Sequence, residues 1–120
     1  MNGKGILKQK ADKLAHKGYD LTQKFPREEL YGLISQIRRA LFSVPANIIE
    51  GYSKNRSRIF LHHLEIAYAS LAEAKYFMNF ACKRNYISKV EYLDFYKNAE
   101  EVSKMLWSNI NTISNKINRE

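Results

Sequence analysis

Apolar residues recur at alternating spacings of four and three in four successive segments of the chain. This spacing places apolar side chains on one face of an α-helix, so each segment predicts an amphipathic helix. Helices of this length joined by short connections pack antiparallel. The pattern therefore predicts an all-α protein, an up-down-up-down antiparallel four-helix bundle, formed by residues 1–120 as a single domain.

Turn and cap residues predict the helix boundaries. The first helix should end near Lys24, because Phe25 precedes a proline, and Pro26 should open the second helix. Ser57 is suited to the N-cap of the third helix. A turn over residues 84–86 should end that helix, and Ser88 with Glu91 matches a capping box that starts the fourth helix.

The second helix contains a proline, which disturbs helical hydrogen bonding. Pro45 has no N–H and crowds the carbonyl of Leu41, so we expect a kink or a local break there. Asn47 and Glu50 are the nearby groups that can bond the disturbed backbone, and we interpret both as structural rather than catalytic. Gly51 suits the left-handed C-terminal cap of the same helix.

A second apolar row lies beside the main stripe of the third helix, beyond what one bundle seam requires. Exposed apolar patches of this kind usually mark an interface, so we predict that the protein associates with itself; the alternative is a wider core. The candidate interface residues are Ile59, Ile66, Tyr76, Phe80 and, beside the stripe of the fourth helix, Trp107.

The chain carries 20 basic and 12 acidic residues, a formal net charge of +8. Most of the excess lies in residues 1–27 and 53–64, whereas residues 88–120 are neutral. This asymmetry favours a polyanion or an acidic protein as partner, and the alternative is a solvated basic face that aids solubility.

Up-down topology brings the start of the chain, the second connection and the end of the chain to one end of the bundle. The free amides that open the third helix would lie there as a further phosphate site. We therefore predict a nucleic-acid-binding surface at this end, formed by Lys4, Lys8, Lys10, Lys54, Arg56, Arg58, Lys116 and Arg119.

No arrangement of residues indicates a reaction centre. The chain has three histidines and no Glu-x-x-His pair, which a di-iron bundle needs, and Cys82 with His16 makes no recognisable zinc set. Gly-rich phosphate loops and nucleophile signatures are also missing. We expect no catalytic residues, no metal, no cofactor and no enzymatic activity. With no apolar run near 18 residues, we also expect a soluble cytoplasmic protein without a membrane partner.

The sequence resembles the four-helix bundle proteins encoded in intervening sequences of bacterial 23S ribosomal RNA genes. The resemblance spans about residues 7–117. It rests on the runs Tyr19-Asp20-Leu21-Thr22, Gln36-Ile37-Arg38-Arg39-Ala40, Ser43-Val44-Pro45-Ala46-Asn47-Ile48, Glu50-Gly51 and Ser70-Leu71-Ala72-Glu73. Ile49 and Ala69 depart from the family pattern, both at packing positions.

The resemblance implies an up-down bundle that assembles as a ring-shaped homopentamer without enzymatic activity. It also implies kinship with the accessory variability proteins of diversity-generating retroelements, which are basic and bind nucleic acid and a reverse transcriptase. Arg38, Arg39, Pro45, Asn47, Glu50 and Gly51 match the family motif, and whether the two arginines face a neighbouring subunit or a ligand stays open.

Two functions follow as hypotheses. The first is a non-enzymatic homo-oligomer that binds RNA or DNA through its basic surface. The alternative is a protein-protein adaptor whose basic surface docks an acidic partner such as a reverse transcriptase or another polymerase. Binding to a polyanion weakens steeply with salt, whereas a packed protein interface weakens less, so the salt dependence distinguishes them.

Overall fold

The computed structural model describes residues 3–54 and 56–119, with side chains from residue 5 onward. Within this part of the chain, four α-helices account for most residues. They are α1 (Gly3–Thr22), α2 (Ser35–Ser53), α3 (Ser57–Lys83) and α4 (Lys89–Arg119). A short 3-10 helix, η1 (Arg27–Glu29), and a π-helical turn, η2 (Leu30–Ile34), lead into α2.

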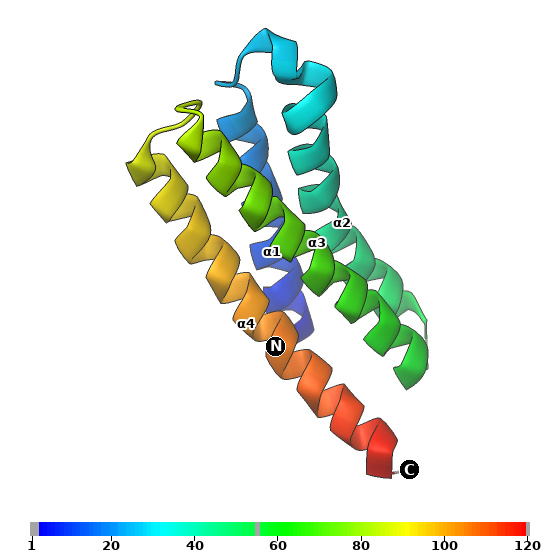
Figure 1. Ribbon diagram of the computed structural model, residues 1–120. Helices are drawn as coiled ribbons and strands as arrows, with labels where there is room; N and C mark the ends of the chain where they lie inside the picture. The colour runs from blue at the N-terminus through cyan, green and yellow to red at the C-terminus, as the bar shows by residue number, and fades with distance from the viewer. Residues whose placement is uncertain (1–2, 55, 120) are drawn as a thin grey trace.

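The four helices run alternately up and down and form an elongated bundle of 50 × 25 × 24 Å (Figure 1). Helix α1 packs against α2 and α4, and α3 packs against the same two neighbours. The described start of α1, the connection from α2 to α3 and the described end of α4 lie toward one end of the bundle (Figure 1). The predicted up-down four-helix bundle is confirmed.

The core consists of the apolar stripes that the spacing predicted. Fully buried side chains come from every helix and include Leu7, Leu41, Leu71, Phe95 and Leu106. Burying each large apolar side chain stabilises the fold by about 1.5–3 kcal/mol. Because one stripe from each helix faces the same axis, the stripes together determine how the helices are rotated.

The entry to α2 is less regular than expected from Pro26. Gly32 has φ −111° and ψ −107°, outside the helical region, within the π-helical turn. The Glu29 carboxylate accepts hydrogen bonds from the N–H of Leu33 at 3.3 Å and from the hydroxyl of Tyr86 at 2.8 Å. The bond to Glu29 raises the pKa of Tyr86. These bonds tie the start of α2 to the turn between α3 and α4.

The break expected at Pro45 is wrong, because α2 remains helical from Ser35 to Ser53. Proline removes only its own N–H from the hydrogen-bond ladder, so the neighbouring bonds can hold the helix together. The side-chain amide of Asn47 donates to the carbonyl of Ser43 at 2.8 Å. Glu50 instead lies 3.5 Å from the ammonium of Lys54.

The left-handed cap expected at Gly51 is also wrong. Gly51 lies inside α2, and none of the described glycines has a positive φ. A Cβ at Gly51 would lie 2.9 Å from Cδ1 of Phe60 and 3.1 Å from Cβ of His63. The glycine therefore allows α2 and α3 to approach closely, and α2 ends at Lys54, which is extended.

The capping box at the start of α4 is confirmed. The N–H of Ser88 donates to Glu91 Oε1 at 2.9 Å, and the N–H of Glu91 donates to Ser88 Oγ at 3.0 Å. The preceding turn is confirmed as well, with Asn85 at φ 64°. Ser57, expected as the N-cap of α3, is its first helical residue, and Arg56 occupies the cap without a side-chain hydrogen bond.

None of the described helices combines the length and the apolar character needed to cross a lipid bilayer.

Candidate nucleic-acid interface

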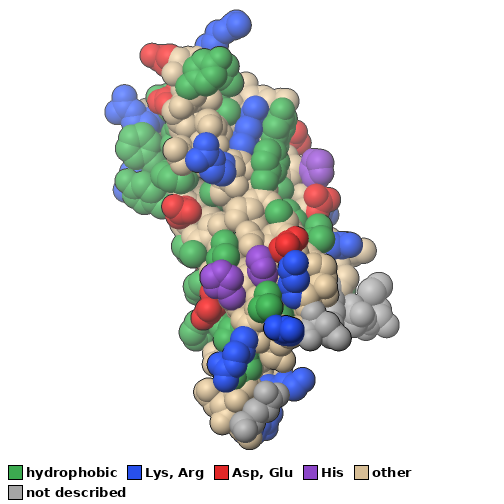
Figure 2. Space-filling view, turned by 90° about the vertical axis from the view of Figure 1, so that its right-hand side faces the viewer, with side chains coloured by type: hydrophobic (Ala, Val, Ile, Leu, Met, Phe, Trp, Pro, Cys, Tyr) green, Lys and Arg blue, Asp and Glu red, His purple; other side chains and the backbone are tan. Residues whose placement is uncertain are grey.

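A hollow of about 280 Å³ lies where α2, the start of α3 and the end of α4 meet. Three basic side chains line it: Lys54 after α2, Arg56 before α3 and Lys116 in α4. Figure 2 shows lysine and arginine side chains gathered at this end of the molecule. The remaining lining residues are Gly51, Tyr52, Ser57, Phe60 and Ile113.

An aromatic pair forms one wall of the hollow. The rings of Tyr52 and Phe60 lie 4.6 Å apart between centroids, tilted by 49°. Both side chains are half-buried, and burial raises the pKa of the Tyr52 hydroxyl. Tyr52 is therefore engaged in packing and is poorly placed to stack on a base, so this wall favours phosphate binding over base recognition.

The charges around the hollow are mostly uncompensated. Lys54 has Glu50 3.5 Å away, but no carboxylate of the described residues pairs with Arg56 or Lys116. The first amides of α3 lack intrahelical acceptors, as in every helix, and the Arg56 side chain does not cap them. Positive charge and free N–H groups thus adjoin the hollow.

The eight basic residues predicted for this surface do not form one cluster. Lys54, Arg56 and Lys116 come together, and Arg58 and Arg119 are exposed at the described ends of α3 and α4. Lys10 is half-buried, lies 3.2 Å from Glu101 and lines a separate hollow of about 60 Å³ between α1 and α4. Lys8 is exposed on α1, and the side chain of Lys4 lies outside the described part.

Arg38 and Arg39 of the family motif differ in their surroundings. The Nε of Arg38 donates to Thr22 Oγ1 at 2.9 Å, and its guanidinium lies 3.7 Å above the ring of Tyr19. Arg38 therefore joins α2 to α1. Arg39 is exposed, and no described carboxylate pairs with it.

Asn47 belongs to a chain of hydrogen bonds between α2 and α3. Its Oδ1 lies 2.9 Å from Nδ1 of His63, and its Nδ2 donates to Ser43 Oγ at 2.9 Å. Ser43 Oγ in turn lies 2.8 Å from Ser70 Oγ. These contacts assign Asn47 a structural role, in agreement with the interpretation made from the sequence.

The five candidate interface residues lie on two different surfaces. Ile59, Tyr76 and Phe80 are exposed on α3, and Ile66 beside them is half-buried. Trp107 of α4 is exposed but packs on Tyr68, with ring centroids 5.8 Å apart. At 100° per residue, Ile66 and Tyr68 lie on opposite flanks of α3. Trp107 therefore does not continue the apolar row of α3.

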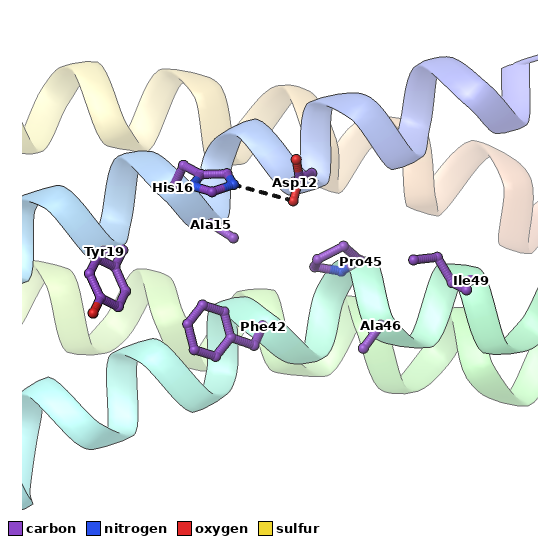
Figure 3. Close-up of a pocket in the computed structure, with 8 residues that line it drawn as sticks. All are labelled: Asp12, Ala15, His16, Tyr19, Phe42, Pro45, Ala46 and Ile49. Atoms are coloured by element: carbon purple, nitrogen blue, oxygen red, sulfur yellow. Dashed lines mark ion pairs between the residues drawn. The ribbon is translucent and has the colours of Figure 1, made fainter.

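An apolar hollow between α1 and α2 was not predicted. It has a volume of about 440 Å³, and Figure 3 shows side chains of both helices along it. Nε2 of His16 lies 3.6 Å from Oδ1 of Asp12 on α1 (Figure 3). The lining residues are Asp12, Ala15, His16, Tyr19, Phe42, Pro45, Ala46 and Ile49. The apolar stripes of the individual helices did not predict this hollow, because it depends on the spacing between α1 and α2.

A row of ion pairs between α1 and α4 was missed as well. The pairs join Lys10 and Lys17 of α1, and Lys24 in the turn after it, to Glu101, Asp94 and Glu91 of α4. The lysine spacing of seven was the available signal, because residues seven apart lie on one helical face. Part of the basic excess in residues 1–27 is therefore neutralised inside the molecule.

Among the described residues, no group of three or more His, Cys, Asp or Glu side chains is placed to hold a metal ion. The geometry around the basic hollow suits electrostatic binding of an anion.

Comparison with known proteins shows the family. A crystal structure of a protein with unknown function from the S23 ribosomal protein family of Bacteroides thetaiotaomicron VPI-5482 has the same fold, with a TM-score of 0.84. It is 24% identical, and the match covers 92% of this chain and 99% of that chain. No curated protein matched the chain. Residues 4–108 match the family described as 23S rRNA-intervening sequence protein, and the chain belongs to this family.

Proposed function

We propose that this protein is a non-enzymatic, self-associating bundle that binds RNA or DNA through phosphates at its basic end. The observation that carries the proposal is the convergence of Lys54, Arg56 and Lys116, from three separate segments, on one hollow. Lysine and arginine that neutralise phosphates release counterions from a nucleic acid, which drives binding without reading the bases.

Self-association would strengthen such binding. Each subunit offers only a few phosphate contacts, but a ring-shaped pentamer, which the family resemblance supports, would present them repeatedly and add them as avidity. The proposed place of action is the cytoplasm. Kinship with the accessory variability proteins of diversity-generating retroelements supports the second candidate, an adaptor that docks an acidic protein such as a reverse transcriptase or another polymerase.

The test is fluorescence anisotropy of labelled structured RNA and duplex DNA across a salt series, with mass by light scattering on the same samples. The variant Lys54→Glu/Arg56→Glu/Arg58→Glu should weaken binding at least about tenfold at low salt, because each reversal replaces an attraction to phosphate by a repulsion. The matched control reverses Lys83, Lys89 and Lys97, which are exposed elsewhere and have no described ion pair.

The control variant has the same net charge as the test variant and should lose much less affinity. Equal losses would show that overall charge, and not this surface, governs binding. Absence of binding by the wild type at low salt would remove the nucleic-acid function and leave the acidic protein partner.

A further inference from the structure

Two apolar hollows follow one another along α2, the first between α1 and α2 and the second on α2 and the preceding turn η2. The first has a volume of about 440 Å³, and the second, of about 540 Å³, is lined by Leu30, Tyr31, Ile34, Ser35, Arg38, Arg39 and Phe42. Phe42 lines both, so the hollows adjoin, and we call them together the α1–α2 groove. Half of the Phe42 side chain and 93% of Tyr31 are exposed. Such exposed apolar area is costly unless another surface covers it.

A second apolar surface lies on α3. It comprises Ile59, Ile66, Tyr76 and Phe80 together with the acidic residues Glu65 and Glu73, and we call it the outer face of α3. His63 and Ser70 contact α2, whereas Tyr68 and Lys75 contact α4. At 100° per residue, Ile59 and Ile66 lie on the α2 flank of α3. The outer face and the groove therefore lie on neighbouring sides of the bundle.

The hydrogen bonds between α2 and α3 show which residues lie at the same height along the bundle. Ser70 is level with Ser43, and His63 is level with Asn47, because each pair is in direct contact. The two helices are antiparallel and have the same rise per residue. Each residue further along α3 is therefore level with a residue one position earlier in α2.

This correspondence aligns the two surfaces. Ile66 is level with Pro45 and Ala46 in the first hollow, and Tyr76 and Phe80 are level with the residues from Leu30 to Ile34 in the second. Between them, Glu73 is at about the level of Arg39. Both Glu73 and Arg39 are exposed and have no ion pair among the described residues.

We propose that the outer face of α3 of one copy docks into the α1–α2 groove of a second copy, with the bundles side by side and their basic ends aligned. Apolar side chains then meet the two hollows, and Glu73 meets Arg39 between them. The pairing is heterologous, since each subunit uses two different surfaces. Each copy is rotated relative to its neighbour in the same direction, so that successive copies can close into a ring.

The available surface is sufficient for this arrangement. A specific interface takes about 800 Å² from each partner, so two interfaces per subunit would cover about a fifth of its accessible surface of 7592 Å². The proposal rests on the self-association in the proposed function and adds which surfaces form it.

The test uses one variant for each surface. Ala46→Glu places a charge on the exposed floor of the groove, and Tyr76→Lys places one on the outer face of α3. Each variant alone should be monomeric by light scattering, while an equimolar mixture should form a heterodimer, because one intact groove and one intact face remain. Val90→Lys, at a 79% exposed position outside both surfaces, is the control and should assemble like the wild type.

Every outcome decides between arrangements. If either variant assembles like the wild type, the surface that it changes lies outside the interface and the proposal is overturned; if Ala46→Glu alone does so, the outer face of α3 docks on a surface other than the groove. If both variants are monomeric and their mixture is too, the two surfaces do not meet. A monomeric wild type overturns self-association itself. If the wild type assembles but the variants do not behave as the proposed interface requires, only the choice of surfaces is overturned.

A charge exchange tests the alignment. Arg39→Glu and Glu73→Arg should each raise the concentration needed for half-assembly at least about tenfold, because like charges then face each other. The double variant should recover to within about threefold of the wild type, since every interface again pairs opposite charges. Additive losses in the double variant would contradict the alignment. Circular dichroism of all variants checks that the bundle remains folded.

Discussion

Leu41 of α2 fills the space beside Gly18 of α1, so there is no room for a side chain at position 18. A Cβ at Gly18 would lie 2.0 Å from Cδ1 of Leu41. Leu41 is only 1% exposed, so it cannot turn into solvent to make room. Close contact between α1 and α2 therefore depends on a single missing atom, as does the contact of Gly51 with Phe60 on the other side of α2.

We predict that Gly18→Ala lowers the free energy of unfolding by about 1–2 kcal/mol, measured by urea denaturation. Overpacking a core costs about 1–3 kcal/mol, and alanine returns up to about 1 kcal/mol through its helix propensity. In a Leu41→Ala background the same substitution should cost little, because the clash is gone. Equal costs in both backgrounds would show that Leu41 is not the cause.

Helix boundaries are determined by local caps at one end of α4 and by tertiary contacts at the start of α2. The reciprocal bonds of Ser88 and Glu91 involve residues three apart, so they form wherever that pair opens a helix. The irregular turn at Gly32 is different, because Glu29 reaches across to Tyr86 of another connection.

Removing the side chain that caps the start of α4 should destabilise the protein. Ser88→Ala removes the acceptor for the N–H of Glu91 and should lower the free energy of unfolding by about 1 kcal/mol. Thermal or urea denaturation measures this. Ser108→Ala, at an exposed position inside α4, is the control and should leave stability nearly unchanged; an equal loss there would contradict the assignment of the cap.

At the scale of the whole molecule, ion pairs join α4 to both of its neighbours. Lys75 of α3 lies 2.5 Å from Glu100, and Lys24 pairs with Glu91. The hydrogen bond from Lys75 holds the pKa of Glu100 below its usual value, and Lys24 does the same for Glu91. A carboxylate with a lowered folded pKa stabilises the fold above its unfolded pKa and loses that contribution as pH falls.

We therefore predict that the free energy of unfolding falls as pH drops below about 4.3, the ordinary pKa of glutamate, through the lower folded values. Urea titrations from about pH 6 to about pH 3 would show it. Glu100→Gln should be less stable near neutral pH and should lose less stability on acidification. The same acid-induced loss in Glu100→Gln as in the wild type would mean that this carboxylate is not responsible.

Much of the candidate site could be predicted from the sequence, but the sequence did not show which of the predicted basic residues lie together. The topology correctly placed Lys54, Arg56 and Lys116 at one end, because alternating helices must return there. Lys10 was grouped with them although it pairs with Glu101, since charge counts do not reveal intramolecular partners. Trp107, beside the stripe of the fourth helix, was likewise counted toward the same interface as the α3 row, and only its contact with Tyr68 shows that it lies on a different surface.

The sequence by itself determined the four helices, their up-down order and the capping box, because these depend on side-chain periodicity and on residues close together in the chain. Only the tertiary structure decided that Gly51 serves close packing and that the hollow between α1 and α2 remains open. Each of these depends on the distance between two helices, and that distance is determined by side chains far apart in the sequence.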